Sequence, residues 1–126
     1  MKTWVSYGQT LLAPSQSIDN PAPNLNGLGG EVTLPYTVPA GQQLVLTSWG
    51  IEGTPGGDSA IIPYVGTVFS QNSQGLPTCR TVDGVSQVNG MWVIPAGTTI
   101  SARIVYAGGV QPIVFGWWIQ GYRELV

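Results

Sequence analysis

The sequence contains no histidine, one cysteine and very few charged residues. Without an imidazole, the chain cannot build a Ser-His-Asp or Cys-His nucleophile, an HExxH metal site or a histidine general base. Because Cys79 is the sole cysteine, an intrachain disulfide and a cysteine-based zinc site are also excluded. We therefore expect a protein that is not an enzyme and that holds no metal or other cofactor.

Charge is scarce, since charged residues make up 8% of the chain against about 25% in an ordinary globular domain. Four Lys and Arg residues cannot supply the phosphate neutralisation on which nucleic-acid affinity depends. No apolar run approaches the roughly 20 residues that span a bilayer, and no charged segment precedes an apolar one as in a signal peptide. These features predict a soluble protein without a nucleic-acid or membrane partner.

The six carboxylates are scattered, and the two nearest in sequence are Glu52 and Asp58. If folding brought them together they would be the first candidates for a glycoside-hydrolysing pair. Solvated loop acids are far commoner than catalytic dyads, and the loop around Asp58 lacks the repeated acids of a calcium-binding EF-hand. We therefore assign no catalytic role to either residue.

The chain is rich in strand and turn signals, with 18 Gly, 10 Pro and 43% hydrophobic residues. Period-two alternation recurs between Gly and Pro clusters, while no helical periodicity lasts three turns. This pattern predicts an all-β antiparallel sandwich, jelly-roll-like, for residues 31–126. The expected strands are 31–38, 43–52, 60–69, 78–82, 86–94, 98–107 and 112–123, with loops at 53–59 and 70–77.

Residues 1–30 are predicted to form a separate N-terminal part, with a short strand at 3–7 followed by an extended arm at 8–30. The arm is polar and rich in Pro, Gly and Asn. Long structureless segments are uncommon in compact domains, so we expect the arm to be ordered by lying along another surface.

Two turn segments resemble each other. Val38-Pro39-Ala40-Gly41 and Ile94-Pro95-Ala96-Gly97 each end one expected strand and begin another. Pro presets φ for a turn and Gly tolerates positive φ, so both segments are interpreted as turns and not as ligand sites. Their repetition predicts equivalent corners of a pseudo-symmetric sandwich.

The last expected strand has two apolar faces. Ile113, Phe115, Trp117 and Ile119 share one face by strand parity. An antiparallel sheet normally gives its other face to water, so the opposite side is predicted to be covered by the arm, a sister subunit or a partner. The residues predicted to form this interface, from the arm and the last strand, are Trp4, Leu11, Leu12, Leu25, Val114, Trp118 and Tyr122.

The aromatic residues also allow a second interpretation. Most of the five Trp residues are expected to fill the core, but an exposed one could provide a stacking surface for sugar rings. The alternative is therefore a carbohydrate-binding or receptor-binding β-sandwich of a phage tail or fibre, with Trp49, Asp58 and Tyr64 as its platform. Exposed aromatics beside the loops 53–59 and 70–77 would favour sugars, whereas aromatics on a flat sheet face would favour subunit contacts.

The V-P-A-G-x-x-L and I-P-A-G-T-x-I turns and the aromatic last strand VFGWWIQGYREL are similar to features of a known protein family. The chain resembles the jelly-roll decoration, or cement, proteins of tailed-bacteriophage heads over residues 31–126. The resemblance implies a virion protein on the outer capsid surface that assembles as a homotrimer. It implies that the protein clamps neighbouring subunits of the major capsid protein, and it brings no catalytic residues.

Overall fold

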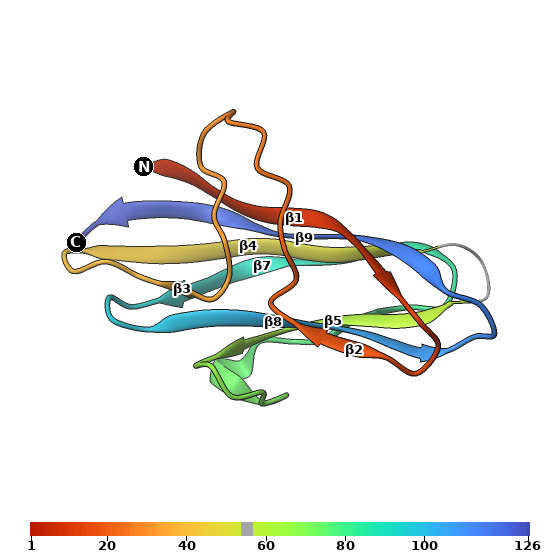
Figure 1. Cartoon of the computed structure of the whole chain (residues 1–126). Coiled ribbons are helices and arrows are strands. Elements are labelled where there is room, and N and C mark those ends of the chain that lie inside the picture. The colour runs from red at the N-terminus through yellow and green to blue at the C-terminus, as the bar shows by residue number, and fades with distance from the viewer. Residues whose placement is uncertain (54–56) are drawn as a thin grey trace.

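The protein is a sandwich of two antiparallel sheets, as expected from the sequence. The computed structural model describes residues 1–53 and 57–126, and Figure 1 shows the two sheets packed face to face. One sheet has four strands in the order β1-β9-β4-β7, and the other has five, in the order β2-β8-β5-β6 with β3 also paired to β8. The strands are β1 (Lys2–Leu12), β2 (Ser17–Asp19), β3 (Tyr36–Thr37), β4 (Gln42–Gly53), β5 (Asp58–Val65), β6 (Cys79–Thr81), β7 (Gly84–Ile94), β8 (Thr99–Gly108) and β9 (Ile113–Leu125), with one 3-10 turn at Ser73–Gly75.

The core lies between the sheets and follows strand parity. Ile100, Ala102, Ile104 and Tyr106 point inward from β8, each at most 1% exposed. Three tryptophans from the four-stranded sheet, Trp4, Trp49 and Trp117, are buried beside them. Each large apolar side chain removed from water contributes roughly 1.5–3 kcal/mol, so this shared layer is what holds the sheets together.

The N-terminal segment differs from the sequence-based expectation. Instead of an arm at 8–30, β1 continues to Leu12 and pairs with β9 along its whole length, and β2 adds a strand to the other sheet. Residues 1–30 thus contribute to both sheets. The arm was expected to begin at Gly8, but Gly8 faces inward, where a Cβ would lie 3.0 Å from the Ala22 oxygen and 3.1 Å from the Trp117 ring. The glycine is there because the interior is crowded, and the strand runs through it.

The expected strand at 31–38 is reduced to Tyr36–Thr37. Glu31 makes only an isolated parallel bridge with Val5, and the Val32 amide donates to the Val5 oxygen at 2.8 Å. Residues 20–35 thus run from β2 past the outer edge of β1 and back to β3 (Figure 1). A chain that crosses between sheets cannot keep one continuous ladder, so alternation here did not produce a long strand.

Other boundaries moved by a few residues. The strand expected at 60–69 begins at Asp58 and ends at Val65. Of the expected loop 53–59, Gly53 ends β4 and Asp58 begins β5, while residues 54–56 lie outside the described residues.

The two PAG segments are turns, as predicted, and they lie side by side. Gly41 and Gly97 have φ of 77° and 83°, a region that favours glycine. The Val38 amide donates to the Thr98 oxygen at 2.9 Å, and the Gly97 amide donates to the Val38 oxygen at 2.8 Å. Each turn carries the chain from one sheet to the other, β3 to β4 and β7 to β8.

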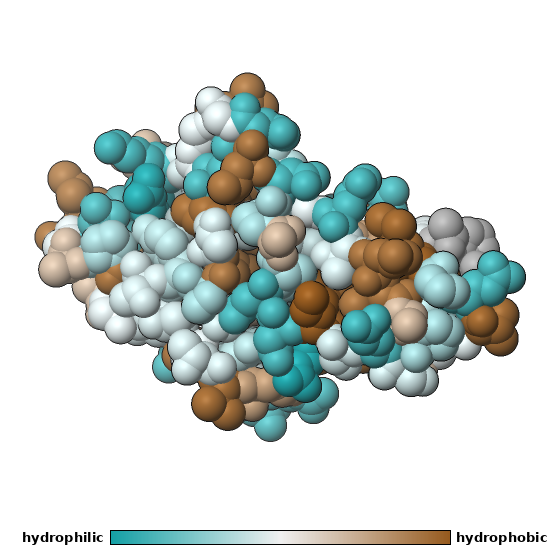
Figure 2. Space-filling view, viewed as in Figure 1, coloured by the Kyte–Doolittle hydropathy of each residue, from teal (hydrophilic) through white to brown (hydrophobic). Residues whose placement is uncertain are grey.

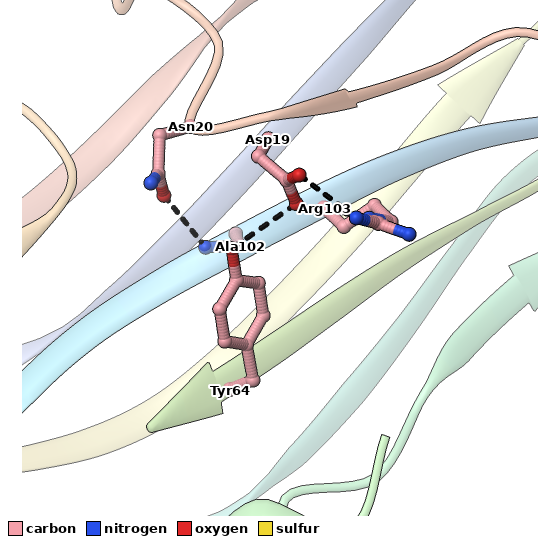
Figure 3. Close-up of polar contacts among 5 residues, drawn as sticks. All are labelled: Asp19, Asn20, Tyr64, Ala102 and Arg103. Carbon is pink, nitrogen blue, oxygen red and sulfur yellow. Dashed lines mark hydrogen bonds and ion pairs between the residues drawn. The ribbon is translucent and has the colours of Figure 1, made fainter. Parts of the chain in front are cut away.

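A polar latch holds β2 against β8 (Figure 3). Asp19 accepts hydrogen bonds from Arg103 Nε at 2.9 Å and Nη2 at 2.8 Å, and from the Tyr64 hydroxyl at 3.1 Å. Next to it, the Asn20 side-chain oxygen accepts from the Ala102 amide at 3.0 Å. The Arg103 contact holds the pKa of Asp19 below its ordinary value. The latch therefore fixes the start of the 20–35 segment to the five-stranded sheet.

Candidate functional site

The outer face of the four-stranded sheet is the candidate site, and β9 is one of the two inner strands of that sheet. Phe115, Trp117 and Ile119 are buried in the core, whereas Val114 is 52% exposed and Trp118 is half-buried on the other side. The two-faced character predicted for this strand is therefore present. The N-terminal segment does not cover the outer face, because β1 lies beside β9 in the same sheet.

Trp118 is held in one position by its neighbours in β4. Its indole Nε1 donates to the Ser48 hydroxyl at 3.3 Å. Its six-membered ring covers Gly50, where a Cβ would lie 2.2 Å from two ring carbons. A larger residue at position 50 would displace the ring, so this glycine allows a tryptophan to lie against the sheet as a fixed, partly exposed aromatic surface.

The residues around Trp118 are set by strand register. Tyr7 in β1 lies opposite Trp118. Two rows further along the same face, Tyr122 lies between Thr3 and Val45. At the other end, exposed Leu11 lies opposite exposed Val114. Figure 2 shows apolar surface near the end of β1 and the start of β9. The face thus combines aromatic and aliphatic side chains, with little charge.

The loop of residues 20–35, called the wall below, lies beside this face. Figure 1 shows the segment between β2 and β3 rising past β1. The Glu31 carboxylate organises the loop by accepting from the backbone amides of Asn26 at 3.0 Å and Gly27 at 2.8 Å, and from the Tyr7 hydroxyl at 3.4 Å. Although desolvation opposes it, these hydrogen bonds lower the pKa of Glu31. Leu25 and Leu28, 60% and 84% exposed, are displayed on this loop.

An open hollow of about 450 Å³ lies between this wall and Trp118. The sequence did not predict its polar residues. Its lining residues are Val5, Tyr7, Gly8, Gln9, Asn24, Glu52, Gly116, Trp117, Trp118 and Gln120. The alternation of Thr3, Val5, Tyr7, Gln9 and Leu11 was the signal that could have placed β1 beside this hollow.

The structure divides the predicted interface residues. Val114, Trp118 and Tyr122 lie on the outer face with Leu11, and Leu25 lies on the wall. Trp4 and Leu12 do not, because their positions in β1 point into the core and leave them 0% and 1% exposed. Assigning them to the interface was wrong, since the strand was predicted to end before its parity could be followed to Leu12.

The predicted sugar platform is not formed. Trp49 and Tyr64 are 0% and 1% exposed, so neither offers a ring face to a ligand. Trp49 points inward after an irregularity in β4 between Leu46 and Ser48, and its indole donates to the Pro77 oxygen at 2.9 Å. Asp58 pairs with Arg80 at 3.4 Å, on the other sheet.

Asp58 and Glu52 thus have different neighbours: Asp58 pairs with Arg80, whereas Glu52 lines the hollow on the four-stranded sheet. Within residues 1–53 and 57–126, no group of three or more His, Cys, Asp or Glu side chains is placed to hold a metal ion. The same residues contain no helix long and apolar enough to cross a membrane.

Comparison with known proteins gives no relative. No family model, no curated protein and no solved structure matches this chain. Function must therefore be argued from the outer face itself.

Proposed function

We propose that this chain is a structural virion protein that decorates and stabilises a bacteriophage capsid. In this proposal a jelly-roll-like sandwich sits on the outer capsid surface as a homo-oligomer and binds the shell of the major capsid protein. The likeness of the turns and last strand to cement proteins suggests the phage setting. The observation that carries the proposal is the fixed, partly exposed Trp118 on a sheet face that has few charged residues.

The placement of the aromatics favours protein contacts over a loop-based sugar site. Trp118 and Tyr122 lie on the outer face of the four-stranded sheet, opposite Gly50 and Val45, whereas the loop 70–77 joins β5 to β6 in the other sheet. Tryptophan and tyrosine anchors dominate the affinity of protein interfaces when they are desolvated on binding. A face with few charges avoids the desolvation penalty of buried ions. Many identical copies on one shell then convert a modest affinity at each site into stable occupancy.

Co-sedimentation with shells tests the proposal. The shells are assembled from the major capsid protein encoded in the same genome as this chain. We expect the wild-type protein to pellet with them and Trp118→Ala to bind about 30-fold more weakly, the loss typical of an interface anchor. Val110→Ala is the control, because Val110 is 90% exposed on the loop between β8 and β9 and belongs to none of the strands that form the face.

Circular dichroism and thermal melting verify that both variants remain folded. If wild type fails to pellet, the capsid proposal is rejected. If Trp118→Ala pellets as well as Val110→Ala, the outer face is not the contact.

A carbohydrate-binding module is the second candidate, and the hollow beside Trp118 favours it. Gln9, Asn24 and Gln120 bring amide groups next to a half-buried indole, and Glu52 adds a carboxylate. A few polar groups placed around an apolar surface are typical of small-molecule sites. A glycan array tests this: hits that disappear in Trp118→Ala and weaken in Gln9→Ala would support it, and a blank array would reject it.

A further inference from the structure

The edge strand β7 is long, and its outer side is not paired with another described strand. At the opposite edge of the same sheet, β1 is covered at Val5 and Tyr7, because the Val5 amide donates to the Gly30 oxygen at 2.8 Å and the Asn24 amide donates to the Tyr7 oxygen at 2.7 Å. In the five-stranded sheet, the edge strands β2 and β6 have only three residues each. Covering and shortening are two ways in which proteins protect sheet edges from pairing.

By contrast, β7 has 11 residues, Gly84–Ile94, with neither a charged residue nor a proline. It pairs with β4 on one side, and no described residue adds a strand to its other side. Its outward side chains include Val85, Met91 and Val93, which are 57%, 69% and 53% exposed. An edge of this length and composition is a template for adding another strand.

The sequence of β7 fits a second copy of itself. In an antiparallel pair related by a two-fold axis through Asn89, all residues from Gly84 to Ile94 are paired. The outward row then places Val85 opposite Val93 of the other copy and Asn89 opposite Asn89. In this alignment valine meets valine, and each Asn89 amide can both donate to and accept from its counterpart, while Gln87 lies opposite Met91.

We propose that two copies of this chain associate through β7 in this antiparallel register, joining their four-stranded sheets into one eight-stranded sheet. Such an isologous contact closes on itself and uses the same surface of both copies. It also places the two outer faces, each with its Trp118, side by side on one surface. The pairing does not depend on the proposed function, and it assigns two-fold symmetry where the likeness to cement proteins implies three-fold.

Engineered cysteines test the register. Directly opposed residues in an antiparallel pair have Cα atoms about 4.5–5.5 Å apart, within the range that a disulfide spans. Asn89→Cys alone is expected to form a covalent dimer on oxidation, because residue 89 faces itself. Val85→Cys alone is expected to stay monomeric in a denaturing gel, whereas a mixture of Val85→Cys and Val93→Cys forms the cross-linked pair. Cys79 is 2% exposed and serves as the unreactive background in the wild type.

Charge substitution tests the energetics. Asn89→Lys and Asn89→Glu each place like charges opposite one another, and each is expected to raise the dimer dissociation constant more than 10-fold in sedimentation equilibrium. An equal mixture of the two variants should recover the dimer. Gln9→Lys is the control, since Gln9 is exposed on β1, at the opposite edge of the sheet from β7. A wild-type monomer at 100 μM, a trimer, or equal cross-linking of Val85→Cys and Asn89→Cys would each overturn the proposal.

Discussion

Replacing Gly121 with alanine should disrupt the four-stranded sheet, whereas the same change at Gly116 should not. Both glycines lie in β9, the strand that carries Trp118, and neither has a positive φ. A Cβ at Gly121 would lie 1.9 Å from the Val45 oxygen and 2.9 Å from the Leu46 Cα. At Gly116 the nearest atom to a Cβ would be the Glu52 Cβ at 3.8 Å, an ordinary contact.

The expected magnitudes follow from which atoms must move. The Cβ–oxygen distance at Gly121 is about 1.1 Å shorter than the closest that real Cβ atoms reach, and both contacts are with backbone. Because β9 is bonded to β1 on one side and β4 on the other, it cannot shift without breaking a ladder. We expect Gly121→Ala to lower the free energy of unfolding by about 2–4 kcal/mol. Gly116→Ala should change it by less than about 1 kcal/mol, in either direction.

Urea denaturation followed by tryptophan fluorescence measures the difference. With a slope of roughly 1–3 kcal/mol per molar urea, the Gly121→Ala midpoint should fall by about 1–3 M, and the Gly116→Ala midpoint should remain close to wild type. Equal midpoints for the two variants would refute the close approach of β9 to β4 at this point. A larger loss in Gly116→Ala would reverse the assignment of inner and outer faces in β9.

Two further predictions concern the Asp19–Arg103 contact on the five-stranded sheet and Trp49 in the core. Asp19→Asn should reduce stability by about 1 kcal/mol at pH 7 by weakening the bidentate contact with Arg103. Because Arg103 lowers the pKa of Asp19 in the folded state, this contribution is complete above the unfolded pKa of about 3.9 and is lost as pH falls through the folded value. In urea titrations from pH 7 to pH 2, the free energies of unfolding of wild type and Asp19→Asn should therefore converge as the pH falls. A difference between them that stays constant over this range would contradict the stabilising role of the Asp19–Arg103 contact. Trp49→Phe should cost about 2 kcal/mol, because it removes the hydrogen bond to the Pro77 oxygen and leaves space beside Trp92. Trp92 has a half-buried ring, and its indole donates no hydrogen bond to any residue of 1–53 and 57–126. Trp92→Phe should therefore cost less than Trp49→Phe, and an equal loss would show that the hydrogen bond to Pro77 does not contribute to stability.

The sequence by itself determined the class of fold and the orientation of most strands. Two-residue alternation fixes which side chains share a face, so the division of β9 into buried Phe115, Trp117 and Ile119 and outward Val114 and Trp118 followed directly. Turn chemistry likewise identified the two PAG corners, because positive φ is cheap for Gly41 and Gly97.

Only the tertiary structure decided how the first 35 residues are used. Gly8 interrupts alternation for a reason that lies in Ala22 and Trp117, which are distant in sequence. The direction of Trp49 depends on an irregularity between β4 and both neighbouring strands, which local periodicity does not contain. The hollow beside Trp118 gathers residues from β1, β4, β9 and the wall. Strand parity is a local property of the chain, whereas register and edge coverage arise from contacts between segments that only folding brings together.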